Sequence, residues 1–96
     1  ESQVILNGSY NINFTMDLVL KDTGLFDDLA KKLDAPLEIS PKVVEIFKDG
    51  QKKYGSRAWS SMIVKRMEDA NNINFRASGF PSELTDNEPE EKGYEI

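Results

Sequence analysis

The sequence predicts a small all-α protein of about three helices, followed by an irregular acidic tail. The chain has 96 residues, which is enough for one domain but not for two. Apolar residues recur every three or four positions in three separate segments, which is the spacing of an amphipathic helix. Acidic residues, glycine and proline then dominate the end of the sequence. These observations divide the chain into a helical region over residues 1–79 and an irregular tail over residues 80–96.

The first predicted helix runs from Phe14 to about Asp34. Its apolar side chains form one stripe, made up of Phe14, Leu18, Leu25, Leu29 and Leu33. Pro36 cannot continue a helix, so the helix is expected to stop just before it. Gly24 weakens the helix by about 1 kcal/mol relative to alanine, and its missing side chain would let a ligand approach closely. Before this helix, residues 1–13 carry only the turn signal Asn7-Gly8-Ser9.

Two further helices are predicted after a short connector. Ser40 as cap and Pro41 in the first turn start the second, Gly55 ends it, and its core face comprises Val43, Val44, Phe47 and Tyr54. The third covers roughly Trp59 to Ala70 and is expected to turn Met62, Ile63 and Met67 inward. Three such helices carry more apolar surface than they can bury on one another. We therefore expect at least one face to pack on something outside this chain.

The net charge of −5 lies entirely in the tail. Between Phe80 and Ile96 there are six acidic residues and one basic residue, while the remainder of the chain is neutral. A neutral body has no basic face for a phosphate backbone, so nucleic-acid binding is not expected. The acidic tail is expected to stay solvated.

Several kinds of chemistry are excluded by composition. The chain has no cysteine and no histidine, which rules out disulfides, thiolate catalysis and a Ser–His–Asp triad and argues against a zinc site. No glycine pair has the G-x-G spacing of a dinucleotide-binding turn, and no metal site is predicted. No apolar run is long enough to cross a membrane and no signal-peptide pattern is present, which favours a cytoplasmic protein. Because residue 1 is Glu1, we expect a processed chain or a piece of a longer protein.

A set of ordered landmarks resembles a known enzyme family. They are Gly8-Ser9-Tyr10-Asn11-Ile12-Asn13-Phe14, Leu18, Leu20-Lys21-Asp22-Thr23-Gly24-Leu25, Ala35-Pro36-Leu37, Gly55 and Trp59-Ser60-Ser61-Met62-Ile63-Val64-Lys65. Over about residues 5–70 this pattern resembles the C-terminal domain of the β-hydroxyacid dehydrogenase family, which includes 3-hydroxyisobutyrate dehydrogenase and 6-phosphogluconate-dehydrogenase-like enzymes. Two positions depart from the family pattern. Thr23 stands where the family has Leu, and Ala58 where many members have Asp.

The resemblance implies an NAD- or NADP-dependent oxidoreductase that acts on a small 3-hydroxy acid or the matching semialdehyde. In that family a Rossmann domain and the catalytic lysine precede this region, so the resemblance places no catalytic residue in this chain. It implies that Lys21 lies against the cofactor and that Phe14 lines the same cleft. Asp22, about 100° further round the helix, would support neighbouring groups. It also implies a homo-oligomer formed through helical faces, no turnover by this chain alone, and no cofactor bound to it in isolation.

A second interpretation stays open, in which the chain is a non-enzymatic helical protein-interaction module. A Lys-Asp pair on an amphipathic helix is ordinarily solvated surface, and one apolar helix face is sufficient to bind a protein partner. The reading frame upstream of Glu1 discriminates the two. A G-x-G-x-x-G after a strand favours the dehydrogenase, whereas a start codon a few residues away favours the module.

Overall fold

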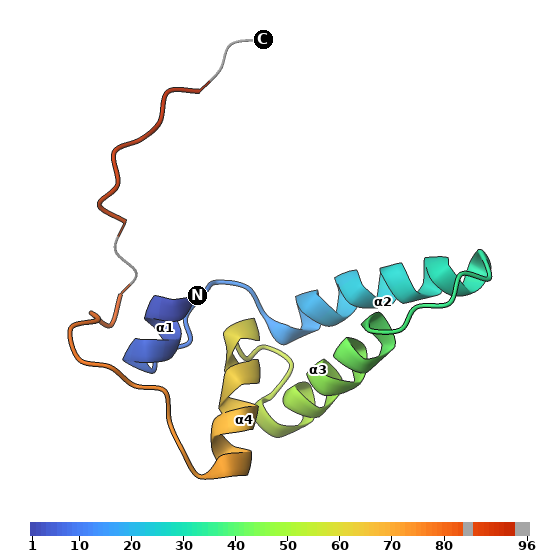
Figure 1. Ribbon diagram of the computed structural model, residues 1–96, viewed down its shortest axis with the longest axis horizontal. Helices are drawn as coiled ribbons and strands as arrows, with labels where there is room; N and C mark the ends of the chain where they lie inside the picture. The colour runs from blue at the N-terminus through green and yellow to red at the C-terminus, as the bar shows by residue number, and fades with distance from the viewer. Residues whose placement is uncertain (84–85, 94–96) are drawn as a thin grey trace.

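The computed structural model describes residues 1–83 and 86–93 and confirms the all-α prediction. Its elements are α1 (Ser2–Asn7), α2 (Met16–Lys32), α3 (Ser40–Tyr54), the 3₁₀ turn η1 (Ser60–Met62) and α4 (Ile63–Asn71). Within those residues no strand is present, and the only extended pairing is a single antiparallel bridge between Thr15 and Trp59. Figure 1 shows α1 and α4 at one end of the molecule, while α2 and α3 form a hairpin arm that projects from the other.

The arm follows the local signals of the sequence closely. α2 begins two residues after Phe14 and ends at Lys32, and Asp34 takes a left-handed conformation that turns the chain back. α3 begins at Ser40 and stops at Tyr54, where Gly55 has a φ of 99°. The one local error in the arm is the predicted N-cap of α3, Ser40. Ile39 occupies the cap position, and the Ser40 hydroxyl donates instead to the carboxylate of Asp27 on α2.

The helix α1 was not predicted, because the sequence reading placed only a turn in residues 1–13. The turn itself is correct: Gly8 ends α1 with a φ of 82°, and its N–H donates to the carbonyl of Ile5. A helix of six residues completes fewer than two turns. It therefore has too few positions for a periodic pattern, and Val4 is the only side chain that it buries.

The third predicted helix begins as η1 and continues as α4 to Asn71. The inward orientation of Met67 was wrong, since this side chain is 53% exposed. Glu68, one residue along, is instead only 2% exposed. This carboxylate can be buried because it accepts hydrogen bonds from Tyr10 and Arg76 on other segments. Its burial sets which side of α4 faces inward.

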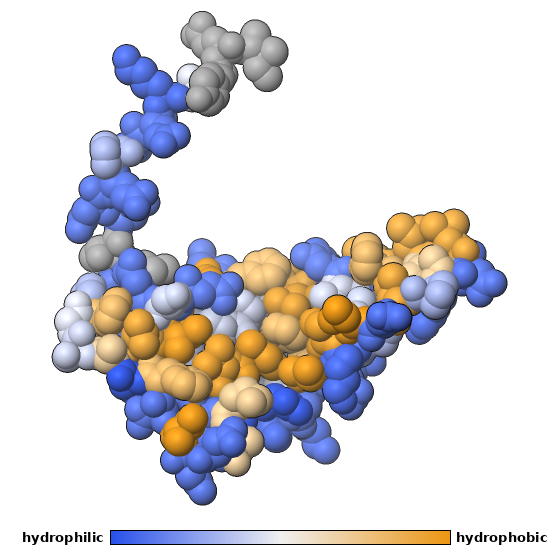
Figure 2. Space-filling view, viewed as in Figure 1, coloured by the Kyte–Doolittle hydropathy of each residue, from blue (hydrophilic) through white to orange (hydrophobic). Residues whose placement is uncertain are grey.

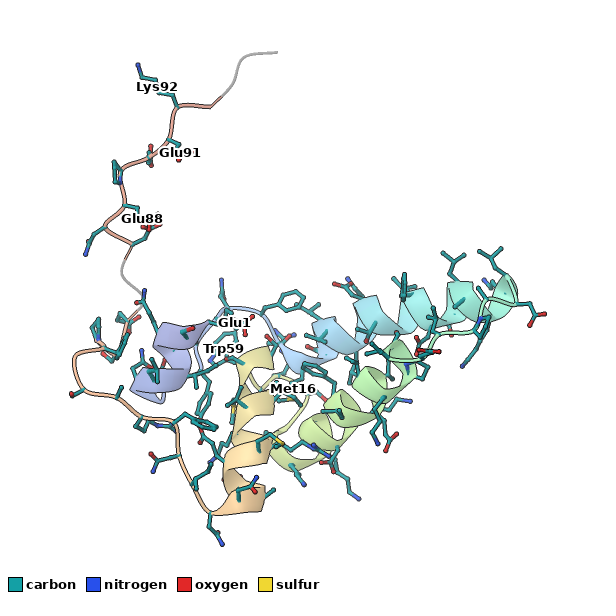
Figure 3. The ribbon with its side chains drawn as sticks, viewed as in Figure 1. Glu1, Met16, Trp59, Glu88, Glu91 and Lys92 are labelled. Atoms are coloured by element: carbon teal, nitrogen blue, oxygen red, sulfur yellow. The ribbon has the colours of Figure 1, made fainter. Side chains whose placement is uncertain are left out.

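The buried core is small and lies where α1, the start of α2 and η1 meet. It comprises Val4, Tyr10 and Met16, together with the polar residues Thr15 and Ser61 and the nearby Glu68 of α4. Backbone hydrogen bonds fix the start of α2 there. The N–H groups of Met16 and Asp17 donate to the 56–58 loop, and Ser60 donates back to the carbonyl of Phe14. Figure 3 labels Met16 and Trp59 on either side of this junction.

The apolar stripe of α2 points away from its neighbouring helix. Leu25, Leu29 and Leu33 are 64%, 53% and 68% exposed. The opposite side of α2, with Leu20 and Gly24, lines a groove together with Val44 of α3. The expectation that this chain leaves apolar helix surface uncovered therefore agrees with α2, and Figure 2 shows apolar side chains gathered at the free tip of the arm.

After Asn72 the chain runs back, without helix or strand, over α1. The Ala77 N–H donates to the carbonyl of Leu6, and the Asn7 amide donates to that of Pro81 over 2.7 Å. Figure 3 shows Glu88, Glu91 and Lys92 standing clear of the body, while residues 84–85 and 94–96 of the predicted tail lie outside the described residues. Among the helices of the described chain, none combines the length and apolarity that a membrane crossing requires.

Candidate functional site

Lys21 lies in the second turn of α2, on the side that borders α3. Its ammonium is 3.4 Å from the carboxylate of Asp22, and both side chains are exposed. The pair stabilises the fold little, because solvent screens an exposed ion pair.

Lys21 lines a groove of about 430 Å³ that runs between α2 and α3. Gly24 lies on the same side, and a β-carbon there would have no other atom within 4 Å, so the groove is open above it. Lys48 of α3 contributes a second ammonium to the opposite wall. The full lining holds three lysines, Lys21, Lys31 and Lys48, and three carboxylates, Asp17, Asp27 and Asp28, so its formal charge is balanced. The lysine ammonium groups can donate hydrogen bonds to the oxygens of an anion that lies beside the unobstructed Gly24.

Asp17 is one of the carboxylates that line the groove. The hydroxyl of Thr15 donates to its carboxylate, the N–H of Leu18 donates over 3.0 Å, and the guanidinium of Arg57 pairs with it at 3.2 Å. These contacts, with the Thr15 hydrogen bond first and Arg57 next, hold the pKa of Asp17 below its ordinary value against its partial desolvation. Asp17 therefore stays ionised one turn from Lys21 and limits which anions fit. The sequence analysis missed this residue, because its contact with Arg57 joins positions 40 residues apart.

The three predicted site residues do not all line one site, although the side chains of Lys21 and Asp22 form an ion pair. Lys21 lines the groove between α2 and α3, whereas Asp22 and Phe14 are not among its lining residues. Asp22 leaves α2 about 100° further round the helix axis than Lys21, yet its carboxylate reaches the Lys21 ammonium at 3.4 Å. Phe14 precedes the helix, its side chain is exposed, and its carbonyl accepts a hydrogen bond from the Ser60 N–H next to the bridge between Thr15 and Trp59. The chain brings one of the three to the groove and leaves the other two on neighbouring surfaces.

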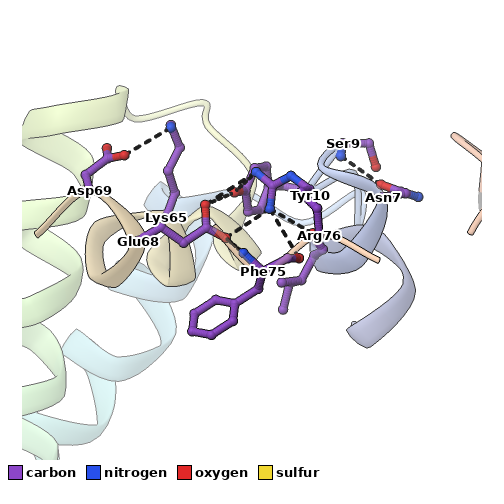
Figure 4. Close-up of polar contacts among 9 residues, drawn as sticks. Asn7, Ser9, Tyr10, Lys65, Glu68, Asp69, Phe75 and Arg76 are labelled. Carbon is purple, nitrogen blue, oxygen red and sulfur yellow. Dashed lines mark hydrogen bonds and ion pairs between the residues drawn. The ribbon is translucent and has the colours of Figure 1, made fainter. Parts of the chain in front are cut away.

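A buried polar cluster lies at the other end of the molecule (Figure 4). The Tyr10 hydroxyl donates to Glu68 over 2.7 Å, and Arg76 donates to both, at 3.0 Å to Glu68 and 2.6 Å to Tyr10. Burial by itself raises the pKa of Glu68, but the hydrogen bonds from Arg76, Tyr10 and the Phe75 N–H outweigh it and leave that pKa lowered. Burial also raises the pKa of Tyr10, as does its hydrogen bond to Glu68.

We interpret this cluster as a structural one that stabilises the fold. Its residues come from the loop after α1, from α4 and from the segment after Asn72, so it ties three parts of the chain together. In the described part of the chain, every buried side-chain nitrogen or oxygen has a hydrogen-bond partner, which leaves none directed at a ligand. No sequence signal could have found the cluster, because its members are up to 66 residues apart.

A second hollow, of about 520 Å³, lies at the tip of the arm. It is shallow and mostly apolar, and it is bordered by Phe26, Leu37, Ile39 and Val43. Across residues 1–83 and 86–93, no three histidine, cysteine or acidic side chains gather in a way that could hold a metal ion. The groove at Lys21 is a place where charged groups from two helices face a common space.

No protein-family model, no curated protein sequence and no solved structure matches this chain. The function is accordingly argued from the residues of the groove and from the ordered landmarks of the sequence.

Proposed function

We propose that this chain is the C-terminal, cleft-closing part of an NAD- or NADP-dependent 3-hydroxyacid dehydrogenase of the cytoplasm. The observation that carries the proposal is the position of Lys21, whose ammonium lines an open groove beside the unobstructed Gly24. The landmarks Lys21-Asp22 and Gly24, Pro36 and Gly55 fall on α2, in the turn and at the end of α3. Each therefore lies where its residue type has a physical role.

The lysines of the groove supply hydrogen-bond donors for an anionic dinucleotide, while Asp17, Asp27 and Asp28 balance their charge. The Lys21 ammonium is a compact donor for phosphate or carboxylate oxygens, and Lys48 adds a second positive charge. Asp22, paired with Lys21, restricts where that ammonium points. In the parent enzyme the dinucleotide would accept or donate the hydride. The remaining roles of this chain would be to close the cleft over a small hydroxy acid and to help build the oligomer.

The first expected result is that the isolated chain is inactive. The proposal assigns both the dinucleotide fold and the proton-handling lysine to a preceding domain, so residues 1–96 alone lack the reacting groups. Absorbance at the reduced nicotinamide band should stay flat with 3-hydroxy acids and either cofactor. Steady NADH or NADPH formation by pure chain, undiminished by further purification, would contradict this assignment.

The second expected result concerns Lys21→Ala in the parent enzyme. Removing one charge-assisted hydrogen bond to the cofactor should raise the KM for the dinucleotide by about tenfold and change kcat less. The matched control is Lys52→Ala, which removes an exposed lysine from α3 outside the groove and should leave both constants unchanged. Identical kinetics for the two variants would remove Lys21 from the cofactor site.

The exposed stripe of α2 favours the alternative, a non-enzymatic helical interaction module. Leu25 and Leu29 present an apolar face that such a module would use. The sequence upstream of Glu1 separates the two functions. A Rossmann fingerprint in frame supports the dehydrogenase, and an initiating methionine a few residues upstream supports the module.

A further inference from the structure

The closed end of the hairpin arm, where the chain turns from α2 into α3 (Figure 1), carries a serine that is followed by proline. Ser40-Pro41 is the only Ser-Pro or Thr-Pro dipeptide in the sequence, because the other three prolines follow Ala35, Phe80 and Glu88. A large class of protein kinases requires proline directly after the serine that it phosphorylates. Such a dipeptide is common in sequences, so its structural surroundings decide whether it is a site.

The segment around Ser40 is accessible to a kinase. Residues 35–39, which precede it, form neither helix nor strand, and Ile39 is 74% exposed. Ser40 itself is half-buried, and it borders the shallow hollow at the tip of the arm. A kinase binds its acceptor segment in an extended form, so the first turn of α3 must open. That opening costs little, because no side chain caps this helix and uncapped helix ends fray easily.

The Ser40 hydroxyl links the two helices of the arm. It donates a hydrogen bond to the carboxylate of Asp27 on α2, and a phosphate ester would lose this donor. Glu38, which borders the same hollow as Ser40, adds a second carboxylate nearby. Lys31 offsets part of this negative charge, because it borders a small cavity together with Asp27 and Pro41. The surroundings of Ser40 therefore suit a neutral hydroxyl better than an added phosphate.

We propose that Ser40 is a phosphorylation site for a proline-directed kinase, and that the phosphate separates α2 from α3 at the closed end of the arm. In the transfer the Ser40 oxygen bonds to the γ-phosphorus of ATP, the bond from that phosphorus to the bridging oxygen breaks, and ADP leaves. The hydroxyl proton passes to the catalytic carboxylate of the kinase. The phosphate carries a charge of about −2 at pH 7, so repulsion from Asp27 replaces the hydrogen bond.

The change would also reach the groove that Lys21 lines. Asp27 lines that groove, as does Lys31 one turn further along α2. A phosphate that repels Asp27 and attracts Lys31 shifts two charged groups of the groove, and in this way it would regulate anion binding there. Regulation of dinucleotide binding rests on the proposed function, whereas the site and its effect on the arm do not. Their failure would leave the cleft proposal intact, and the reverse also holds.

Incubation of the chain with a purified proline-directed kinase and Mg·ATP tests the site, with the product mapped by mass spectrometry. The expected result is a single phosphate, on Ser40. Ser40→Ala should abolish it, and Pro41→Ala should slow it at least about tenfold, because the hydroxyl remains but the recognised proline is lost. The matched control is Ser56→Ala, which removes an exposed serine without a following proline and should change nothing. An unmodified chain, or a phosphate on another serine instead, overturns the site.

Hydrogen exchange of the phosphorylated chain tests the effect on the arm. Amide protection in residues 27–32 and 40–44 should fall about tenfold, since the lost contact joins these segments, while protection in α4 should be unchanged. Asp27→Asn isolates the repulsion, because its amide oxygen still accepts the Ser40 hydrogen bond but carries no charge. Phosphorylation of this variant should therefore lower protection much less. An equal loss in both chains, or no loss in the wild type, overturns the proposed separation.

Discussion

Replacing Arg76 with alanine is expected to lower the free energy of unfolding by about 3 kcal/mol. Arg76 is the cationic partner of Glu68, whose side chain is only 2% exposed. Without the guanidinium, the buried carboxylate keeps only the Tyr10 hydroxyl and the Phe75 N–H. An uncompensated buried charge is costly, and the loss also frees the segment that crosses α1. Urea unfolding followed by circular dichroism measures the change.

The matched control is Arg57→Ala. Arg57 also pairs with a carboxylate, that of Asp17 at 3.2 Å, but its side chain is 79% exposed. Solvent screens such a pair, so the expected loss is below about 1 kcal/mol. Equal losses in the two variants would show that the cluster at Glu68 does not behave as a buried pair.

The pH dependence of stability provides a second test of the cluster at Glu68. Because the folded-state pKa of Glu68 is lowered, its contribution to stability is present above its unfolded pKa of about 4.3 and disappears as the pH falls through its folded-state value. In Arg76→Ala the largest lowering contact is gone and burial raises that pKa. The wild-type chain should therefore lose more stability on acidification than the variant does.

Met16→Ala is expected to lower the free energy of unfolding by about 3 kcal/mol, as much as Arg76→Ala. Met16 is fully buried at the start of α2, and its sulfur packs at the backbone of Gly50 on α3, where Ile63 of α4 also reaches. The truncation leaves a cavity at the point where these helices meet. A domain of this size has little stability to spare, so the variant should be largely unfolded near body temperature.

Met67→Ala supplies the control for Met16. It removes the same side chain from α4, but at a position that is 53% exposed, so the loss should stay within about 0.5 kcal/mol. Met16→Leu should cost less than about 1.5 kcal/mol, since the replacement conserves volume. A similar midpoint of urea unfolding for Met16→Ala and Met67→Ala would contradict the assignment of Met16 to the core.

Local chemistry predicted the hairpin arm almost to the residue. Pro36 and Pro41 limit where a helix can end or begin, and Gly55 provides the positive φ that stops α3. Such signals act within a few residues and can therefore be recognised from the sequence. α1 escaped detection because six residues are too few for a periodic pattern, and its stability comes from contacts with the segment after Asn72.

The candidate site was predictable only in part. Lys21 could be placed on an amphipathic helix, and it lines the groove between α2 and α3. The separation of Phe14 from this groove, and the negative charge that Asp17 brings to it, depend on how the 56–58 loop meets the start of α2. Contacts between segments that lie about 40 residues apart in the sequence cannot be recognised from local composition.

The sequence by itself determined the helical class, the boundaries of α2 and α3, and the acidic tail, because propensity, capping and charge act locally. The tertiary structure alone decided which side of α2 meets α3 and which residue of α4 is buried. Hydrophobic burial has no direction, so an apolar stripe predicts that a helix packs but not on which neighbour. Hydrogen-bond partners decided the rest: Glu68 is buried, and Met67 exposed, because Tyr10 and Arg76 satisfy the carboxylate.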